Sequence, residues 1–147
     1  KPYPHRAQHF QRYNPNYQYV GINILNYSNC VGHNIVAREM KEYPGRLYVV
    51  TGDLNDGTED PSVQAILNPP EGPKMFDTLQ GLPESERRTW PADPEKGHGF
   101  APEQFDHILV PCDQKEKVQD SYVVNIKGIS IPASDHLELV AKLQLDK

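Results

Sequence analysis

The strongest constraint on the fold is an alternating pattern over residues 137–145. Leucine or alanine occupies every second position, and glutamate, valine, lysine and glutamine occupy the positions between them. Successive side chains of a β-strand point to opposite faces of its sheet, so alternation of this kind predicts a strand with one buried face. We therefore expect a half-buried β-strand over this segment.

Shorter patterns predict further strands along the chain. In each of them β-branched or other apolar residues follow one another or alternate with polar ones. The segments are residues 19–25, 47–51, 105–111 and 122–126.

Two helices are expected between these strands. Apolar residues over residues 33–43 fall on one helical face, and Pro44 with its following glycine ends that segment. A shorter helix is expected over residues 61–68, because Pro61 suits the first helical position and Asp60 suits the N-cap.

Two stretches lack such patterns. Residues 1–18 are rich in Pro, Tyr, Asn and Gln without any period, which indicates an irregular amino-terminal arm before a domain over residues 19–147. Residues 69–104 hold half of the 14 prolines, so we expect them to be mainly loop.

Composition narrows the classes of function. A net charge of -5 argues against a protein that binds nucleic acid through its overall field, although a local cationic groove stays open. No run approaches the apolar length of a membrane span. Cys30 and Cys112 form no metal-binding motif, so we expect two buried small hydrophobes whose disulfide state is open. Localisation also stays open, with a processed or secreted product among the alternatives because Lys1 stands first.

Three acidic or histidine-containing motifs stand at the ends of expected strands. Asp53 and Asn55 follow one strand, Asp106 opens another, and Asp135 with His136 precedes the last. Singly, each motif has a plain explanation as a turn or as a cap of loop backbone. A rigid sheet can nevertheless hold such side chains on a common rim, so we expect all five to converge.

The motifs also occur in a characteristic order. The series is Thr51-Gly52-Asp53-Leu54-Asn55-Asp56, Phe76-Asp77-Thr78, Thr89-Trp90, Phe105-Asp106-His107-Ile108-Leu109 and Ser134-Asp135-His136. This series resembles the endonuclease/exonuclease/phosphatase family, which includes DNase I-like nucleases, over residues 47–147. The resemblance implies an α+β fold, namely half of a four-layered α/β/β/α sandwich with mainly antiparallel strands.

The same resemblance implies a phosphoester hydrolysis centre that uses Mg²⁺, or Mn²⁺ or Ca²⁺ in its place. Asp53 would orient the attacking water and contact the metal, Asn55 would hold a phosphate oxygen, and Asp135 would contribute to the metal site. His136 would contact the phosphoryl group, with its ring fixed by Asp106. A carboxylate on one ring nitrogen sets the tautomer and leaves the other nitrogen for the substrate.

The chain departs from the family in its first third. The family's amino-terminal half supplies an Asn and a Glu that is the principal metal ligand, and no counterpart is recognisable. We assign Glu39 and Glu42 to the solvated face of a helix. The family normally has a strand that ends in His-Leu where this chain has Ile24-Leu25, and His33 is a poor replacement for that His, as Asn26 is for the family's Asn.

These departures leave several functions open. The leading hypothesis is phosphodiesterase or nuclease-type hydrolysis by a split or processed enzyme, completed by a complementary polypeptide or by self-association. The alternative is a degenerate, non-catalytic family member that serves as a binding or structural assembly subunit. A truncated enzyme for phospholipids or sugar phosphates is a third reading. The substrate is expected to be a phosphodiester, nucleic acid included, since Trp90 suits base stacking as well as packing.

Overall fold

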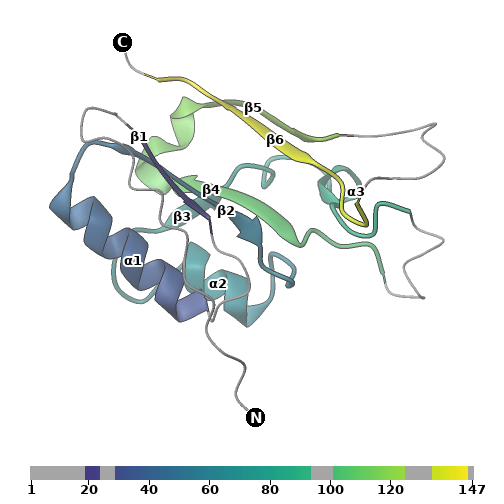
Figure 1. Ribbon diagram of the computed structural model, residues 1–147, viewed down its shortest axis with the longest axis horizontal. Helices are drawn as coiled ribbons and strands as arrows, with labels where there is room; N and C mark the ends of the chain where they lie inside the picture. Colours follow the sequence, from purple (N-terminus) through teal and green to yellow (C-terminus); the bar gives the residue numbers. More distant parts are fainter. Residues whose placement is uncertain (1–18, 24–28, 94–100, 125–133, 146–147) are drawn as a thin grey trace.

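The elements of the chain alternate between helices and strands (Figure 1). The computed structural model describes residues 19–23, 29–93, 101–124 and 134–145. In chain order its elements are β1 (Tyr19–Asn23), α1 (Asn29–Glu42), β2 (Leu47–Asp53), α2 (Pro61–Leu67), β3 (Met75–Asp77), α3 (Glu84–Arg87), β4 (Asp106–Pro111), the 3-10 helix η2 (Cys112–Lys117), β5 (Val118–Val123) and β6 (Leu139–Leu143).

The strands form two sheets that lie in different layers. The larger sheet has the order β1-β2-β4-β3, in which β1 is parallel to β2 and the other pairs are antiparallel. The smaller sheet is the antiparallel pair β5-β6. Helices α1 and α2 lie on one side of the larger sheet and β5-β6 lies on the other (Figure 1). This α/β/β order is that of a partial four-layered sandwich, as expected.

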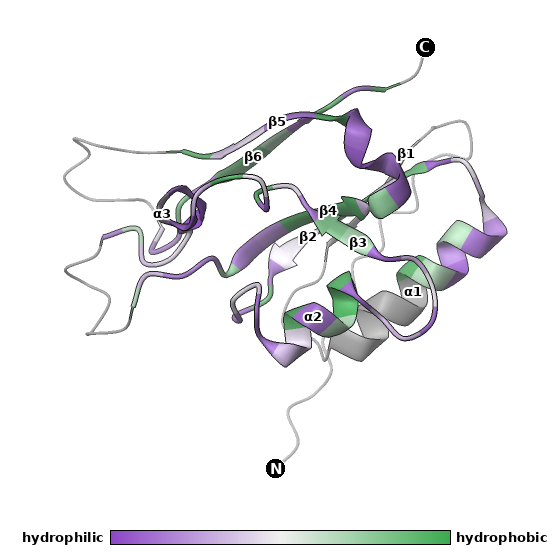
Figure 2. Ribbon diagram, turned by 180° about the vertical axis from the view of Figure 1, so that it is seen from behind, coloured by the Kyte–Doolittle hydropathy of each residue, from purple (hydrophilic) through white to green (hydrophobic). Residues whose placement is uncertain are grey.

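The hydrophobic core lies between the helices and the larger sheet. Its buried members come from α1, β2, α2, β3 and β4, and are Val36, Val50, Val63, Ile66, Leu67, Met75 and Leu109. Helix α2 places three of these at positions i, i+3 and i+4, which form one helical face. Figure 2 shows the hydrophobic stretch of β3 and β4 beside α2. Burying each such side chain contributes about 1.5–3 kcal/mol.

A buried tyrosine fastens α1 to the start of β2. The hydroxyl of Tyr48 lies 2.7 Å from the carbonyl oxygen of Glu39 and 2.9 Å from that of Tyr43. The carbonyl of Glu39 also accepts from the amide of Tyr43 at 2.8 Å, and the hydroxyl has one hydrogen, which it can donate to either of these two carbonyls where α1 ends. The chain then reverses at Gly45, whose φ of +84° is open to glycine without strain.

Most expected elements are confirmed, with shifted bounds. Helix α1 begins before residue 33, β5 begins before residue 122, and the described residues of the 69–104 segment, 69–93 and 101–104, are loop interrupted by β3 and α3. Asp60 occupies the N-cap of α2, but its side chain makes no cap hydrogen bond, because Oδ2 accepts one from the amide of Gly57 at 2.8 Å. The expected arm over residues 1–18 lies outside the described residues, as do residues 24–25 and 125–126 of two expected strands.

Two other expectations concern the cysteines and the membrane. The prediction that Cys112 is buried is wrong, because the residue opens η2 on the surface and is exposed as a free thiol. The side chain of Cys30 lies outside the described part of the structure. Among the helices that the structure describes, none has the length and apolar character needed to cross a membrane.

Candidate active site

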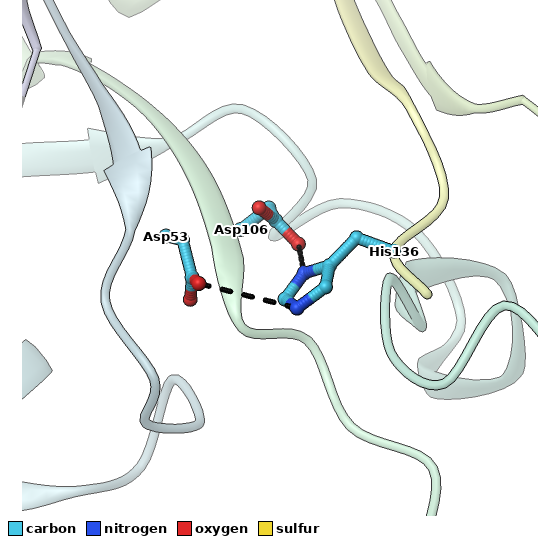
Figure 3. Close-up of side chains that lie close together, drawn as sticks. All are labelled: Asp53, Asp106 and His136. Atoms are coloured by element: carbon cyan, nitrogen blue, oxygen red, sulfur yellow. Dashed lines mark hydrogen bonds and ion pairs between the residues drawn. The ribbon is translucent and has the colours of Figure 1, made fainter. Parts of the chain in front are cut away.

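Three side chains from distant parts of the sequence meet at one rim of the larger sheet (Figure 3). Asp53 ends β2 and Asp106 begins β4, and the antiparallel register sets the two residues directly opposite each other. His136 reaches them from the segment before β6. Its Nδ1 lies 2.6 Å from Oδ2 of Asp106, and its Nε2 lies 3.9 Å from Oδ2 of Asp53. The expected convergence of these three residues and the Asp106–His136 hydrogen bond are confirmed.

The turn after β2 orients the carboxylate of Asp53. The backbone amide of Asn55 donates to Oδ1 of Asp53 at 2.9 Å, and Oδ2 is the oxygen that faces His136. Asn55 itself has a φ of 55°, in the left-handed region that asparagine tolerates better than most residues. The amide of Leu54 donates to the carbonyl of Phe105 at 2.8 Å, so the turn starts from a paired strand end.

Asn55 and Asp135 flank this cluster. The side chain of Asn55 is exposed. Asp135 is exposed as well, and its backbone carbonyl accepts a 2.7 Å hydrogen bond from the amide of Ala92. The hydroxyl of Ser134 accepts from the amide of His136 at 3.1 Å, which fixes the turn that presents the imidazole. The convergence expected of all five residues is thus confirmed for three. Asp135 precedes His136 and its charge acts on the imidazole, but its carboxylate is not among the ligand atoms that meet there.

The pKa of His136 is raised above its ordinary value. Burial of the ring lowers the pKa, but the hydrogen bond to Asp106 raises it, as do the negative charges of Asp106, Asp53 and Asp135. The combined effect of the carboxylates outweighs burial, because the side chain is still 23% exposed. The imidazole at this rim therefore holds its proton more strongly than a free imidazole does.

The cluster is also a group that could hold a cation. One ligand atom from each of Asp53, Asp106 and His136 lies within 4.8 Å of the others. Carboxylate oxygens are the ligands that Mg²⁺ and Ca²⁺ prefer, and an imidazole is accepted by Mn²⁺. One oxygen of each carboxylate already has a hydrogen-bond partner, namely Oδ2 of Asp106 with His136 and Oδ1 of Asp53 with the amide of Asn55. The second oxygen of each carboxylate is therefore the one that could bind a cation.

Neither glutamate of α1 belongs to this site. Glu39 and Glu42 lie near the end of α1, which leads into the start of β2, whereas Asp53 lies at the other end of that strand. Glu42 is exposed and Glu39 is partly buried beside Arg38, 3.5 Å away. The side chain of His33, and Asn26 as a whole, lie outside the described residues.

Thr89 supports the site in a way that the sequence analysis did not foresee. Its side chain is fully buried, and its Oγ1 accepts hydrogen bonds from the amides of Phe105 and Asp106, each at 3.0 Å. Its carbonyl accepts from the amide of Leu137 at 2.7 Å. Thr89 thereby joins the backbone that carries Asp106 to the backbone that carries His136. No local pattern signals these contacts, because they span long sequence separations.

A second cluster of buried polar residues was also missed. Nδ1 of His107 lies 2.7 Å from Oδ2 of Asp77, and the amide group of Gln104 donates to the same oxygen at 2.8 Å. The motif series contained His107 and Asp77 but gave them no role. The available signal was strand alternation, since the neighbour of an outward-facing Asp106 must point inward.

The chain is similar to known proteins in structure, whereas the comparisons of its sequence find no match. None of the known protein-family models matches the sequence, and no curated protein matches it significantly. A mannosyl-6-phosphatase of Bacteroides thetaiotaomicron has a similar structure, with a TM-score of 0.58 and 19% identity over 83% of this chain and 51% of its own. A truncated TDP2 of Caenorhabditis elegans has a TM-score of 0.58 and 18% identity over 93% and 63%.

A third similar structure is an endonuclease/exonuclease/phosphatase family protein from Bacteroides thetaiotaomicron. Its TM-score is 0.50 at 19% identity, over 84% of this chain and 48% of its own. The chain thus spans less than two thirds of the length of each of these three structures. The described residues have the DNase I-like fold of endonuclease/exonuclease/phosphatase proteins, and they make up about half of it.

Proposed function

We propose that this chain is part of a metal-dependent phosphoesterase of the phosphodiesterase or nuclease type. The observation that carries the proposal is the meeting of Asp53, Asp106 and His136, in which one carboxylate holds the ring and the other faces its second nitrogen. Two of the similar structures are named as a phosphatase and as a member of a phosphatase and nuclease family, which supports phosphoester chemistry.

His136 would stabilise negative charge on the phosphoryl group. Asp106 accepts a hydrogen bond from Nδ1, so the ring is fixed with Nε2 directed toward Asp53. The raised pKa of His136 favours a protonated ring, which can donate to a phosphate oxygen. The 3.9 Å between Nε2 and Asp53 is too long for a direct hydrogen bond, so a water that donates to Asp53 can bridge the two groups.

Asp53 would orient the attacking water. Its Oδ1 is held by the amide of Asn55, so the carboxylate keeps one direction with Oδ2 on the side of His136. The exposed amide side chain of Asn55 would donate to a phosphate oxygen on the same rim without adding negative charge. Attack by a positioned water needs no covalent nucleophile from the protein.

Asp53 and Asp135 would hold a Mg²⁺ ion, or Mn²⁺ or Ca²⁺ in its place. A bound divalent cation would neutralise the charge that develops on the transferring phosphoryl group. Mg²⁺ gives up its water reluctantly, so a site with few carboxylates binds it weakly. We therefore assign a further acidic ligand to a complementary polypeptide or a second copy, which fits a chain that spans 48–63% of the similar structures.

Paramagnetic broadening by Mn²⁺ tests the metal site without requiring activity. In the nuclear magnetic resonance spectrum, the strongest broadening is expected at Asp53, Asp135 and His136. Asp53→Asn should abolish it at the same ion concentration. Asp120→Asn is the matched control, because Asp120 is an exposed carboxylate of β5 that pairs with Lys142 at 3.2 Å. Strongest broadening in any other region would refute the metal assignment.

Turnover tests the split arrangement separately. The purified chain with Mg²⁺ should hydrolyse a generic phosphodiester such as bis(p-nitrophenyl) phosphate at a negligible rate. Hydrolysis should appear when a polypeptide that supplies the remaining half of the fold is added, and it should be lost again with Asp53→Asn. Full metal-dependent turnover by a demonstrated monomer would show that no complementary chain is needed.

A further inference from the structure

A second histidine–carboxylate pair is buried behind the candidate active site. His107 follows Asp106 in β4, so its side chain points to the opposite face of the sheet. Nδ1 of His107 lies 2.7 Å from Oδ2 of Asp77, and each side chain is 1% exposed. A group so deeply buried cannot touch a substrate, and any contribution to the site must pass through a neighbour.

The orientation of the His107 ring is fixed from several sides. Oδ1 of Asp77 accepts from the amide of Leu79 at 2.9 Å, and its Oδ2 accepts from Gln104 at 2.8 Å. With the carboxylate held, the ring is held as well, and its Nε2 lies 3.2 Å from the backbone carbonyl oxygen of Asp56. Both ring nitrogens face oxygen atoms, so a hydrogen on Nε2 would be donated to the carbonyl of Asp56.

Asp56 belongs to the loop that shapes the active-site rim, residues 54–60. The same loop contains Asn55, whose amide orients Asp53. Gln104 makes a second contact between the buried cluster and this loop, since its Oε1 accepts from the hydroxyl of Thr58 at 3.3 Å. At Gly57 an added Cβ would come within 3.2 Å of Glu103, so the loop lies close against the segment before β4. The buried cluster therefore supports the loop from beneath.

We propose that His107 is a positioning residue, which fixes the 54–60 loop through a hydrogen bond from its Nε2 to the carbonyl of Asp56. Packing alone does not account for the pair, because apolar residues of similar volume often replace buried ion pairs without loss of stability. Apolar residues cannot supply a hydrogen-bond donor that points at one carbonyl oxygen. The inference rests on the proposed function for the roles of Asp53 and Asn55, and its test requires neither metal nor substrate.

Two substitutions separate the contacts of the ring. His107→Gln places an amide nitrogen near the position of Nε2 and keeps the donor to Asp56. His107→Asn places it near Nδ1 and keeps only the contact with Asp77. Amide exchange of Asn55 and Gly57, relative to the β2-β4 ladder, should rise roughly tenfold in the Asn variant and stay within about twofold in the Gln variant.

A matched control separates loosening of the loop from general instability. Val110→Ala removes a fully buried side chain from the same strand, β4, at a position with no polar contact to the loop. It should lower the global stability without a selective rise in exchange at Asn55 and Gly57. A folded His107→Asn variant in which these two amides exchange as in the wild type would overturn the proposal.

The wild-type protein supplies a readout that no folding failure can remove. The ¹⁵N shifts of the His107 ring should show a hydrogen on Nε2, with a scalar coupling to the carbonyl carbon of Asp56 across the hydrogen bond. A ring that carries no hydrogen on Nε2 would overturn the proposal directly. Both readouts are spectroscopic, so they can fail separately from the turnover test. If His107→Asn loosens the loop but the wild-type chain shows no hydrolysis with the complementary polypeptide added, the proposed function alone is refuted. If the wild-type chain hydrolyses the phosphodiester with that polypeptide but the loop is unaffected by His107→Asn, the positioning role alone is refuted.

Discussion

Thr89→Val removes one oxygen and should disturb both halves of the candidate active site. Valine has nearly the same shape as threonine, so the buried space at position 89 stays filled. The lost Oγ1 is the acceptor for the amides of Phe105 and Asp106, each at 3.0 Å. Neither amide has a ready replacement in the interior, so the substitution leaves two donors without that partner.

The expected loss of stability follows from those two donors. Leaving a buried donor unpaired costs about 1–3 kcal/mol. Phe105 and Asp106 are only partly buried, which places the sum for both at about 2–4 kcal/mol. Thr89→Ser keeps the oxygen and removes one methyl group, which costs about 1 kcal/mol. Urea denaturation of the two variants and the wild type measures the difference.

The same pair of variants reports on the site itself. If Thr89 holds the backbone of Asp106 in place, Thr89→Val should weaken the contact of Asp106 with His136 and return the pKa of His136 toward its ordinary value. Thr89→Ser should leave that pKa raised. A valine variant as stable as the serine variant, with an unchanged pKa of His136, would refute the idea that this hydroxyl organises the site.

Three further outcomes are expected. Asp106→Asn should lower the pKa of His136 in a nuclear magnetic resonance titration, because it removes both a hydrogen bond and a charge that raise it. The raised pKa makes protonated His136 stabilise the fold below its unfolded value of about 6.5, and this contribution is lost as pH rises through the folded pKa. Urea denaturation across this range should show the loss in the wild type and not in His136→Gln. Asn55→Ala should cost about 1 kcal/mol more than Asn55→Gly in the same assay, because φ is 55°.

Much of the fold could be predicted from local sequence patterns. The alternation before and within β6 predicted a half-buried strand, and Leu137 is indeed buried while Glu138 and Lys142 are exposed. Such patterns report the period of one element, which local sterics determine. Such patterns say less about where an element begins and ends, so the expected start of β5 at residue 122 lies several residues after its actual start at Val118.

The pairing of distant elements could not be predicted in the same way. Position 53 faces position 106 because β2 and β4 pair in one particular register, and nothing near either residue specifies that register. The supporting contacts of Thr89 depend on the same packing. The ordered motif series compensated for this gap only in part, since it gave roles to Asp106 and His136 but contained Thr89 without assigning a role to it.

Strand β4 places two histidine–aspartate pairs on opposite faces of the larger sheet. Adjacent residues of a strand face opposite sides, so Asp106 points to the rim and meets His136, while His107 points inward and meets Asp77. The outer pair is partly exposed and can contact a ligand, whereas the inner pair is sealed and can only transmit position. Because both pairs share the backbone of one paired strand, a shift of β4 would move the ring of His136 and the support of the 54–60 loop together. The geometry of Asp53, Asp106 and His136 is therefore set within the chain itself, and under the proposed function a complementary polypeptide or second copy would need to supply only the additional acidic ligand.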